Sequence, residues 1–133
     1  MDFLARVLWF KILVTLILWS IPCLLFPVSW LVWVGMPEPE PKLLLQLYGA
    51  ATIALVVGYV SGLRRLARGD DIRNIVWVGI TSNGSASLIL FLHGIAGTWE
   101  EWGILAQIYM WISALLTASI TLGLVAGLFR GDR

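Results

Sequence analysis

The sequence is poor in charged side chains, in cysteine and in histidine. Charged residues make up only 13% of its 133 residues, about half the share found in a typical soluble domain. Cys23 is the only cysteine, so no disulfide can form within the chain, and His93 is the only histidine. Because a transition metal takes three or four such ligands, we expect no metal site. The net charge of +1 provides no basic surface for nucleic acid.

Catalytic motifs and intramembrane acids are also missing. The sequence contains no CxxC, HxxxH, GxGxxG or GxxxxGK(S/T) motif, so we expect a protein that is not an enzyme. No Asp or Glu lies within any of its long apolar stretches. Proton-coupled carriers usually keep an acidic side chain in the membrane, where it loads and releases the proton. Its absence disfavours a small-solute transporter.

Apolar residues are abundant, at 59% of the chain, and they are unevenly distributed. Short charged segments separate four long apolar stretches, which is typical of membrane spans rather than of a buried soluble core. We predict an all-α fold, a single domain over residues 1–133 that forms an integral membrane four-helix bundle. The spans are predicted at about residues 8–27, 43–63, 74–96 and 103–129.

The first span contains a lysine and a proline. Lys11 lies about one turn inside the span, and we expect its long side chain to snorkel to the headgroups. Pro22 lacks a backbone N–H and should kink the helix. No small-x-small cleavage site follows this span, so we interpret it as a retained anchor rather than a signal peptide.

The connectors carry their own signals. Residues 29–35, with Trp30 and Trp33, are too few to span a bilayer and should lie at its interface. Asp70 and Asp71 are placed to cap the third span. The run 98–101 fits a capping box for the fourth span, with Thr98 as its N-cap.

The basic residues predict the orientation of the chain. All of them except Lys42 fall on one side of the predicted spans: Arg6, Lys11, Arg64, Arg65, Arg68, Arg73, Arg130 and Arg133. The positive-inside rule therefore predicts that both termini are cytoplasmic, and we expect the bacterial inner membrane. The loops on the other side carry all the glutamates, namely Glu38, Glu40, Glu100 and Glu101.

Small residues recur every four positions on two spans. Helices in lipid associate where small side chains let their backbones approach. The second span has Ala50, Ala54, Gly58 and Gly62, and the fourth has Ser119, Gly123 and Gly127. Either these faces meet inside one bundle, or one of them packs against another membrane subunit.

Several polar side chains fall at similar depth near the outer ends of the spans. They are His93, Gln46, Gln107, Tyr48, Tyr109 and Cys23. Together they could form an outer pocket for a quinone or a lipid headgroup, and Trp19 and Trp111 could pack against a flat pigment. Alternatively, these groups hydrogen-bond to one another and hold the helices in register. The mid-span run 81–87, which includes Ser82 and Asn83, is expected to bond to its own backbone or to a neighbouring helix.

In its layout the sequence resembles the small bacterial four-helix membrane proteins that include the DoxX-like families. The resemblance rests on the run 25–27 (LFP) at the end of the first span, Met36-Pro37 in the next loop, and the run 46–50 (QLYGA) with Gly58 in the second span. It implies a four-helix bundle, in some members an accessory or quinone-linked subunit of a membrane redox complex. It transfers no catalytic residue.

Two functions follow as expectations. The first is a non-catalytic accessory subunit that packs by a small-residue helix face against a larger membrane complex. The second is a quinone- or lipid-binding protein with an outer-leaflet pocket around His93, Gln46 and Gln107.

Overall fold

The computed structural model describes residues 3–130, and within them every regular element is helical. The predicted all-α fold is therefore confirmed. The elements are α1 (Phe3–Val14), the π-helical segment η1 (Thr15–Ser20), α2 (Ile21–Leu25), α3 (Val28–Trp33), α4 (Lys42–Ala67), α5 (Arg73–Ile95) and α6 (Ile104–Phe129). Arg133, one of the basic residues behind the predicted orientation, lies outside the described residues.

Four helical runs are long and apolar enough to cross a membrane. They are Phe3–Leu25, in which α1, η1 and α2 follow one another without a break, and the helices α4, α5 and α6. At 1.5 Å per residue, the 26 residues of α4 extend about 39 Å. The chain thus has the architecture of a multi-pass membrane protein. The first run begins at Phe3 rather than near residue 8, and α4 continues to Ala67 rather than ending at Leu63.

The first run changes its helical winding just before Pro22. In regular α geometry the carbonyl of Leu18 would accept the N–H of residue 22, and proline has none. The chain widens into η1 there, and the hydroxyl of Tyr109 on α6 donates a hydrogen bond to the Leu18 carbonyl. The local change found at Pro22 is therefore a π-helical segment, and a tyrosine from another helix bonds to the carbonyl that proline leaves without its α-helical donor.

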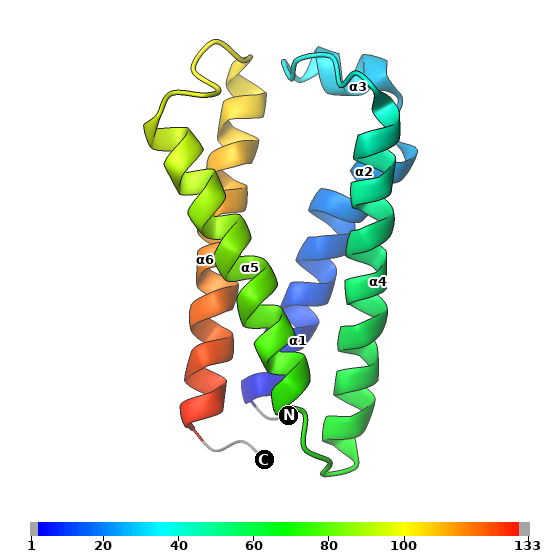
Figure 1. The fold of residues 1–133 in the computed structure, drawn as a ribbon, viewed down its shortest axis with the longest axis vertical. Helices are drawn as coiled ribbons and strands as arrows, with labels where there is room; N and C mark the ends of the chain where they lie inside the picture. The colour runs from blue at the N-terminus through cyan, green and yellow to red at the C-terminus, as the bar shows by residue number, and fades with distance from the viewer. Residues whose placement is uncertain (1–2, 131–133) are drawn as a thin grey trace.

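The helices form two pairs that meet at one end and separate toward the other (Figure 1). One pair is α5 with α6, and the other is α4 with the run α1–η1–α2. We call the end near both termini and the α4–α5 loop the terminal end, and the opposite end the α3 end. Near the terminal end a buried cluster joins the two pairs, with Leu8 from α1, Tyr59 from α4, Val76 from α5 and Leu124 from α6.

Close backbone contacts explain why the helices pack where they do. A Cβ atom added to Gly49 of α4 would lie 2.8 Å from Cγ of Leu24, and one added to Gly62 would lie 2.9 Å from Cγ2 of Ile75 on α5. Glycine at these positions lets the neighbouring helix approach more closely than a side chain would allow.

At the α3 end, the short helix α3 lies crosswise over the pair formed by α4 and the run α1–η1–α2 (Figure 1). Its loop is tied to the start of α6, because Gly103 donates its N–H to the Gly35 carbonyl at 3.0 Å and Ala106 donates to Val34 at 3.0 Å. Gly35 has φ +94°, and an added Cβ would collide with the backbone of Gly103. The loop that follows α3 therefore joins the two helix pairs across this end.

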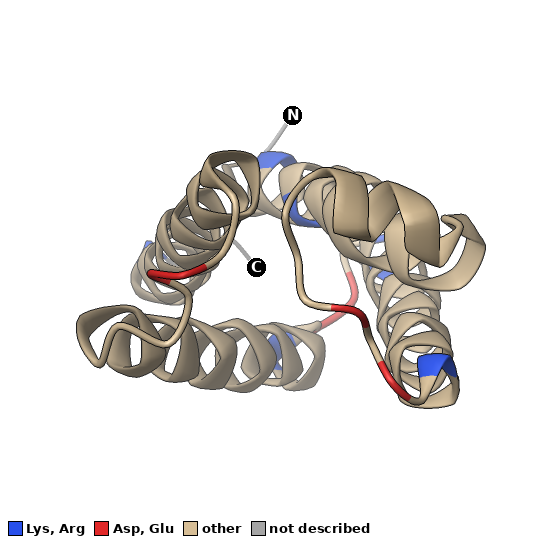
Figure 2. Cartoon of the chain, turned by 90° about the horizontal axis from the view of Figure 1, so that it is seen from above, with Lys and Arg blue, Asp and Glu red and all other residues tan. Residues whose placement is uncertain are grey.

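Charge is divided between the two ends. Seen from the α3 end, the acidic residues there lie in the two loops (Figure 2), and Lys42 is the first residue of α4, directly after one of these loops. At the terminal end, Asp71 Oδ1 accepts the backbone N–H of Arg73 at 2.9 Å, but the N-cap residue of α5 is Ile72, so neither Asp70 nor Asp71 occupies the predicted cap position. The capping box predicted at Thr98 is wrong, because residues 98–102 form turns and α6 begins only at Ile104, with Gly103 as its N-cap.

Candidate functional site: two cavities between the helix pairs

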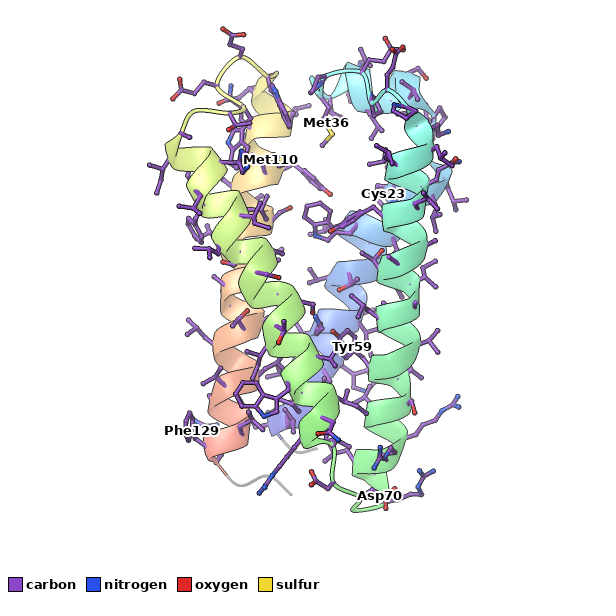
Figure 3. The ribbon with its side chains drawn as sticks, viewed as in Figure 1. Cys23, Met36, Tyr59, Asp70, Met110 and Phe129 are labelled. Atoms are coloured by element: carbon purple, nitrogen blue, oxygen red, sulfur yellow. The ribbon has the colours of Figure 1, made fainter. Side chains whose placement is uncertain are left out.

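The separation of the helix pairs leaves a cavity of about 1220 Å³ at the α3 end, which we call the outer cavity. Its walls are almost entirely apolar, and they come from η1, α2, α3, the loop after α3, the start of α4, the loop before α6 and α6 itself. Met36 and Met110 lie on opposite sides of the gap (Figure 3). Aromatic and sulfur-containing walls adapt to the shape of a bound apolar molecule. The principal lining residues are Trp19, Phe26, Trp30, Leu31, Trp102 and Met110.

A second cavity of about 320 Å³, the inner cavity, lies next to the first one. Trp19 and Met110 line both cavities, so these two side chains form the boundary between them. Unlike the outer cavity, the inner one has many polar groups in its walls. They are Lys11, Thr15, Tyr48, Thr52, Tyr59, Ser82, Asn83 and Thr117.

Most of these polar groups are satisfied by the helix backbone. Asn83 Nδ2 donates to the Gly79 carbonyl at 2.9 Å, and Ser82 Oγ donates to the same carbonyl at 3.2 Å. Thr117 donates to the Ser113 carbonyl at 2.8 Å. The expectation that the run 81–87 bonds to its own backbone is therefore confirmed for Ser82 and Asn83. Hydroxyls bound in this way can still accept a hydrogen bond but have no proton left to donate.

Lys11 is the exception, because it is buried without a partner of opposite charge. Its residue is only 2% exposed, and its ammonium lies 4.3 Å from the centroid of the Tyr59 ring, a cation–π contact. Within residues 3–130, no hydrogen bond or ion pair engages this ammonium, and no acidic residue lies in any of the four long helical runs. A desolvated cation without a counter-charge is costly in a membrane interior.

The snorkelling expected of Lys11 is wrong, and the packing of α1 gives the reason. Lys11 shares one helix face with Leu4, Leu8 and Thr15, and this face is buried against the other helices. Gly79 on α5 lies close to the side chain, since a Cβ added there would be in van der Waals contact with Cε of Lys11, at 3.7 Å. The sequence carried a signal for this placement in the spacing of Leu4, Leu8, Lys11 and Thr15, which is the spacing of one helix face.

The structure does not assemble the outer pocket predicted around His93. His93 is exposed rather than turned toward protein, and its Nδ1 lies 2.9 Å from the Thr98 hydroxyl, with which it shares a hydrogen bond. Gln46 is also exposed on α4. Gln107 donates to the carbonyls of Glu100 and Trp102, at 3.0 and 2.8 Å, and so fixes the loop before α6. None of the three lines either cavity. The hydrogen bonds of Gln107 therefore fit the alternative interpretation, in which the polar groups hold the structure together and bind no ligand.

The other members of that predicted set do reach the cavities. Cys23 and Tyr109 line the outer cavity, and Tyr48 lines the inner one. The Trp19 ring lies between the two tyrosine rings, with centroids 5.8 Å from Tyr48 and 5.6 Å from Tyr109. Trp111 instead packs edge-on against Trp99, at 5.7 Å between centroids, and lines neither cavity. Of Trp19 and Trp111, the two tryptophans expected to pack against a flat ligand, only Trp19 therefore lines the cavities.

The two small-residue faces have different environments. On α6, a Cβ added to Gly127 would lie 2.9 Å from Cδ1 of Leu4, and one added to Gly123 would lie 3.2 Å from Val7, so this part of the face packs against α1. Ser119, about one turn nearer the start of α6, is exposed. On α4 the face is exposed at Ala50, Ala54 and Gly58, and only Gly62 is buried. Nothing lies within 4 Å of a Cβ added to Gly58.

Comparison with protein-family models, with curated proteins and with solved structures found no match to this chain. The resemblance to the DoxX-like families therefore stays a prediction. The arguments for function rest on the cavities and the helix faces themselves.

Proposed function

We propose that the protein binds an elongated, largely apolar ligand, such as a quinone or a lipid, in the outer cavity. The observation that carries this proposal is the cavity of about 1220 Å³ with almost wholly apolar walls. It is larger than the roughly 300–1,000 Å³ typical of small-molecule pockets. The walls of an empty space of this size would lose dispersion contacts, which a bound chain restores. Compared with the expected quinone or lipid pocket, the site moves from His93 to Trp19 and Met110.

The distribution of charge supports an orientation for this site. The arginines in and beside the α4–α5 loop lie at the terminal end, and the glutamates of both other loops lie at the α3 end. By the positive-inside rule the terminal end faces the cytoplasm, so the outer cavity lies in the outer half of the bilayer. The layout shared with DoxX-like proteins favours the bacterial inner membrane. A ligand dissolved in the outer leaflet would then reach the cavity without crossing the bilayer.

Blocking the cavity tests the proposal. In Met110→Trp an indole ring replaces the slender methionine side chain at the boundary between the two cavities. Ile112→Trp adds the same ring at an exposed position on the same helix. Each protein is extracted in mild detergent, and retained small molecules are identified by native mass spectrometry. We expect the wild type and Ile112→Trp to carry a stoichiometric apolar molecule and Met110→Trp to lose it. Equal retention by all three would contradict the proposal.

A second function, an accessory subunit of a larger membrane complex, is favoured by the free face of α4. Ala50, Ala54 and Gly58 are exposed, although small residues usually mark positions where another helix packs. The partner would be a transmembrane helix lying along α4. In Gly58→Leu, a partner present in native membranes should no longer co-purify, while the protein itself stays folded. Co-purification unchanged from the wild type would count against this function.

A further inference from the structure

We propose that the inner cavity binds the carboxylate head of an amphiphile whose apolar chain lies in the outer cavity, with Lys11 as the counter-ion. This inference rests on the proposed function, because it names the class of ligand for the same site. Three features carry it: the unpaired charge of Lys11, the few hydrogen-bond donors that remain free around it, and the position of the inner cavity relative to the outer one.

The first feature is the charge. The Lys11 ammonium faces the Tyr59 ring and lines the inner cavity, but within residues 3–130 no carboxylate comes near it. The acidic side chains of the described residues lie in the loops, outside the four long helical runs. A cation–π contact offsets only part of the cost of desolvation. An anion brought in by a ligand would be held strongly there because the surroundings have a low dielectric constant.

The second feature is the supply of donors. Thr52, Ser82 and Thr117 already donate their hydroxyl protons to backbone carbonyls. No hydrogen bond within residues 3–130 uses the hydroxyl of Thr15, which is four residues from Lys11 on the same helix face and also lines the cavity. The Tyr48 hydroxyl is also free within the described residues, but Lys11 and Thr15 share one helix face and can donate side by side to the two oxygens of one carboxylate. One positive charge also balances one negative charge, which favours a monoanion over a phosphate dianion.

The third feature is the arrangement of the two spaces. The inner cavity, at about 320 Å³, has room for a headgroup but not for a long chain as well. The outer cavity has room for the chain, and Trp19 and Met110 line both. A molecule with a polar head toward Lys11 and a chain toward α3 would satisfy the chemistry of both walls. A long-chain carboxylate is the simplest molecule of that kind.

Binding of oleate and of oleyl alcohol to the purified protein in non-ionic detergent tests this inference. The two probes have the same chain and differ in the charge of the head. We expect the wild type to bind radiolabelled oleate at least about ten-fold more tightly than the alcohol. Lys11→Met keeps the length of the side chain and removes its charge, and it should abolish this preference while leaving the affinity for the alcohol unchanged. Lys42→Met, which removes a lysine at the start of α4 that lines neither cavity, should retain the preference.

The outcomes separate the two proposals. If the wild type binds oleate and the alcohol equally, the carboxylate inference is wrong while the proposed function stands, and this comparison needs no variant to fold. If neither probe binds, both are wrong. Competition with acetate distinguishes the source of the carboxylate. No displacement of oleate supports an amphiphile, whereas displacement would show that the cavity recognises a free small carboxylate and would overturn the role of the chain.

Discussion

The two ends of the bundle are built differently from the same kinds of helix. At the terminal end, Leu8, Tyr59, Val76 and Leu124 from four different helices form one buried cluster. At the α3 end, α5 and α6 pack with the loop between them around Leu90, Trp99 and Ala114, and the other helix pair contributes the partly buried Trp19 to this cluster. The space between the pairs at this end is a cavity.

The difference follows from which residues face the centre at each end. Near the terminal end, Gly62 and Gly79 let neighbouring helices come close, and leucines fill the remaining space. Toward the α3 end, the facing side chains are large aromatic rings and methionines, which hold the helices apart. Because helices in lipid associate by packing rather than by escape from water, closeness of fit decides which regions are stable. The terminal end is therefore the closely packed part of the bundle, and the α3 end holds the cavity in which we propose that the ligand binds.

The largest expected effect comes from filling the close contacts of the terminal end. In Gly79→Leu the new Cβ alone would lie 2.7 Å from Cδ1 of Leu124, so the side chain would push α5 away from α6. We expect a loss of about 3 kcal/mol in the free energy of unfolding, measured by circular dichroism during titration with a denaturing detergent. Gly58→Leu is the matched control, since nothing lies within 4 Å of that position. A similar loss of stability in both variants would contradict the difference between the packed position 79 on α5 and the exposed position 58 on α4.

Much of this fold could be predicted from the sequence, because each apolar stretch extends over some twenty residues and no single residue decides the prediction. The four apolar stretches have the length of a bilayer, and the α5 and α6 bounds, Arg73–Ile95 and Ile104–Phe129, agree closely with the predicted spans. The first run was harder to delimit. The apolar run predicts a start at about residue 8, yet α1 continues back to Phe3, with Arg6 exposed on its surface.

The candidate site was harder to predict, because it depends on the rotation of each helix about its own axis. His93 was placed inside by its spacing from Gly79 and Ala86, but fourteen residues are nearly four helical turns, and the accumulated error turns the ring outward. Lys11 was placed outside by a general rule about long basic side chains, although its neighbours on the helix face are buried leucines. The separation of the helix pairs depends on all four helices together, and no local pattern indicates it.

A smaller effect is expected where the two helix pairs are joined by a side-chain hydrogen bond. Tyr109→Phe removes the donor that satisfies the Leu18 carbonyl, which Pro22 leaves without its α-helical partner. We expect a loss of about 1 kcal/mol in the free energy of unfolding. Tyr48→Phe is the matched control, since Tyr48 also packs against Trp19 but makes no side-chain hydrogen bond within residues 3–130. Equal stability of the two variants would show that water or the backbone satisfies Leu18 instead.

The smallest effect is expected at His93, and it sharpens the choice between the two locations for the ligand. His93 is exposed, lines neither cavity and bonds only to Thr98, so His93→Ala should change the free energy of unfolding by less than about 0.5 kcal/mol. Retention of the bound molecule, measured by native mass spectrometry, should be unchanged from the wild type. Loss of the molecule in His93→Ala together with its retention in Met110→Trp would return the site to the outer end of α5. Retention of the molecule in His93→Ala together with its loss in Met110→Trp would support a binding site between the helix pairs. Only a ligand bound there would be displaced by an indole ring at position 110.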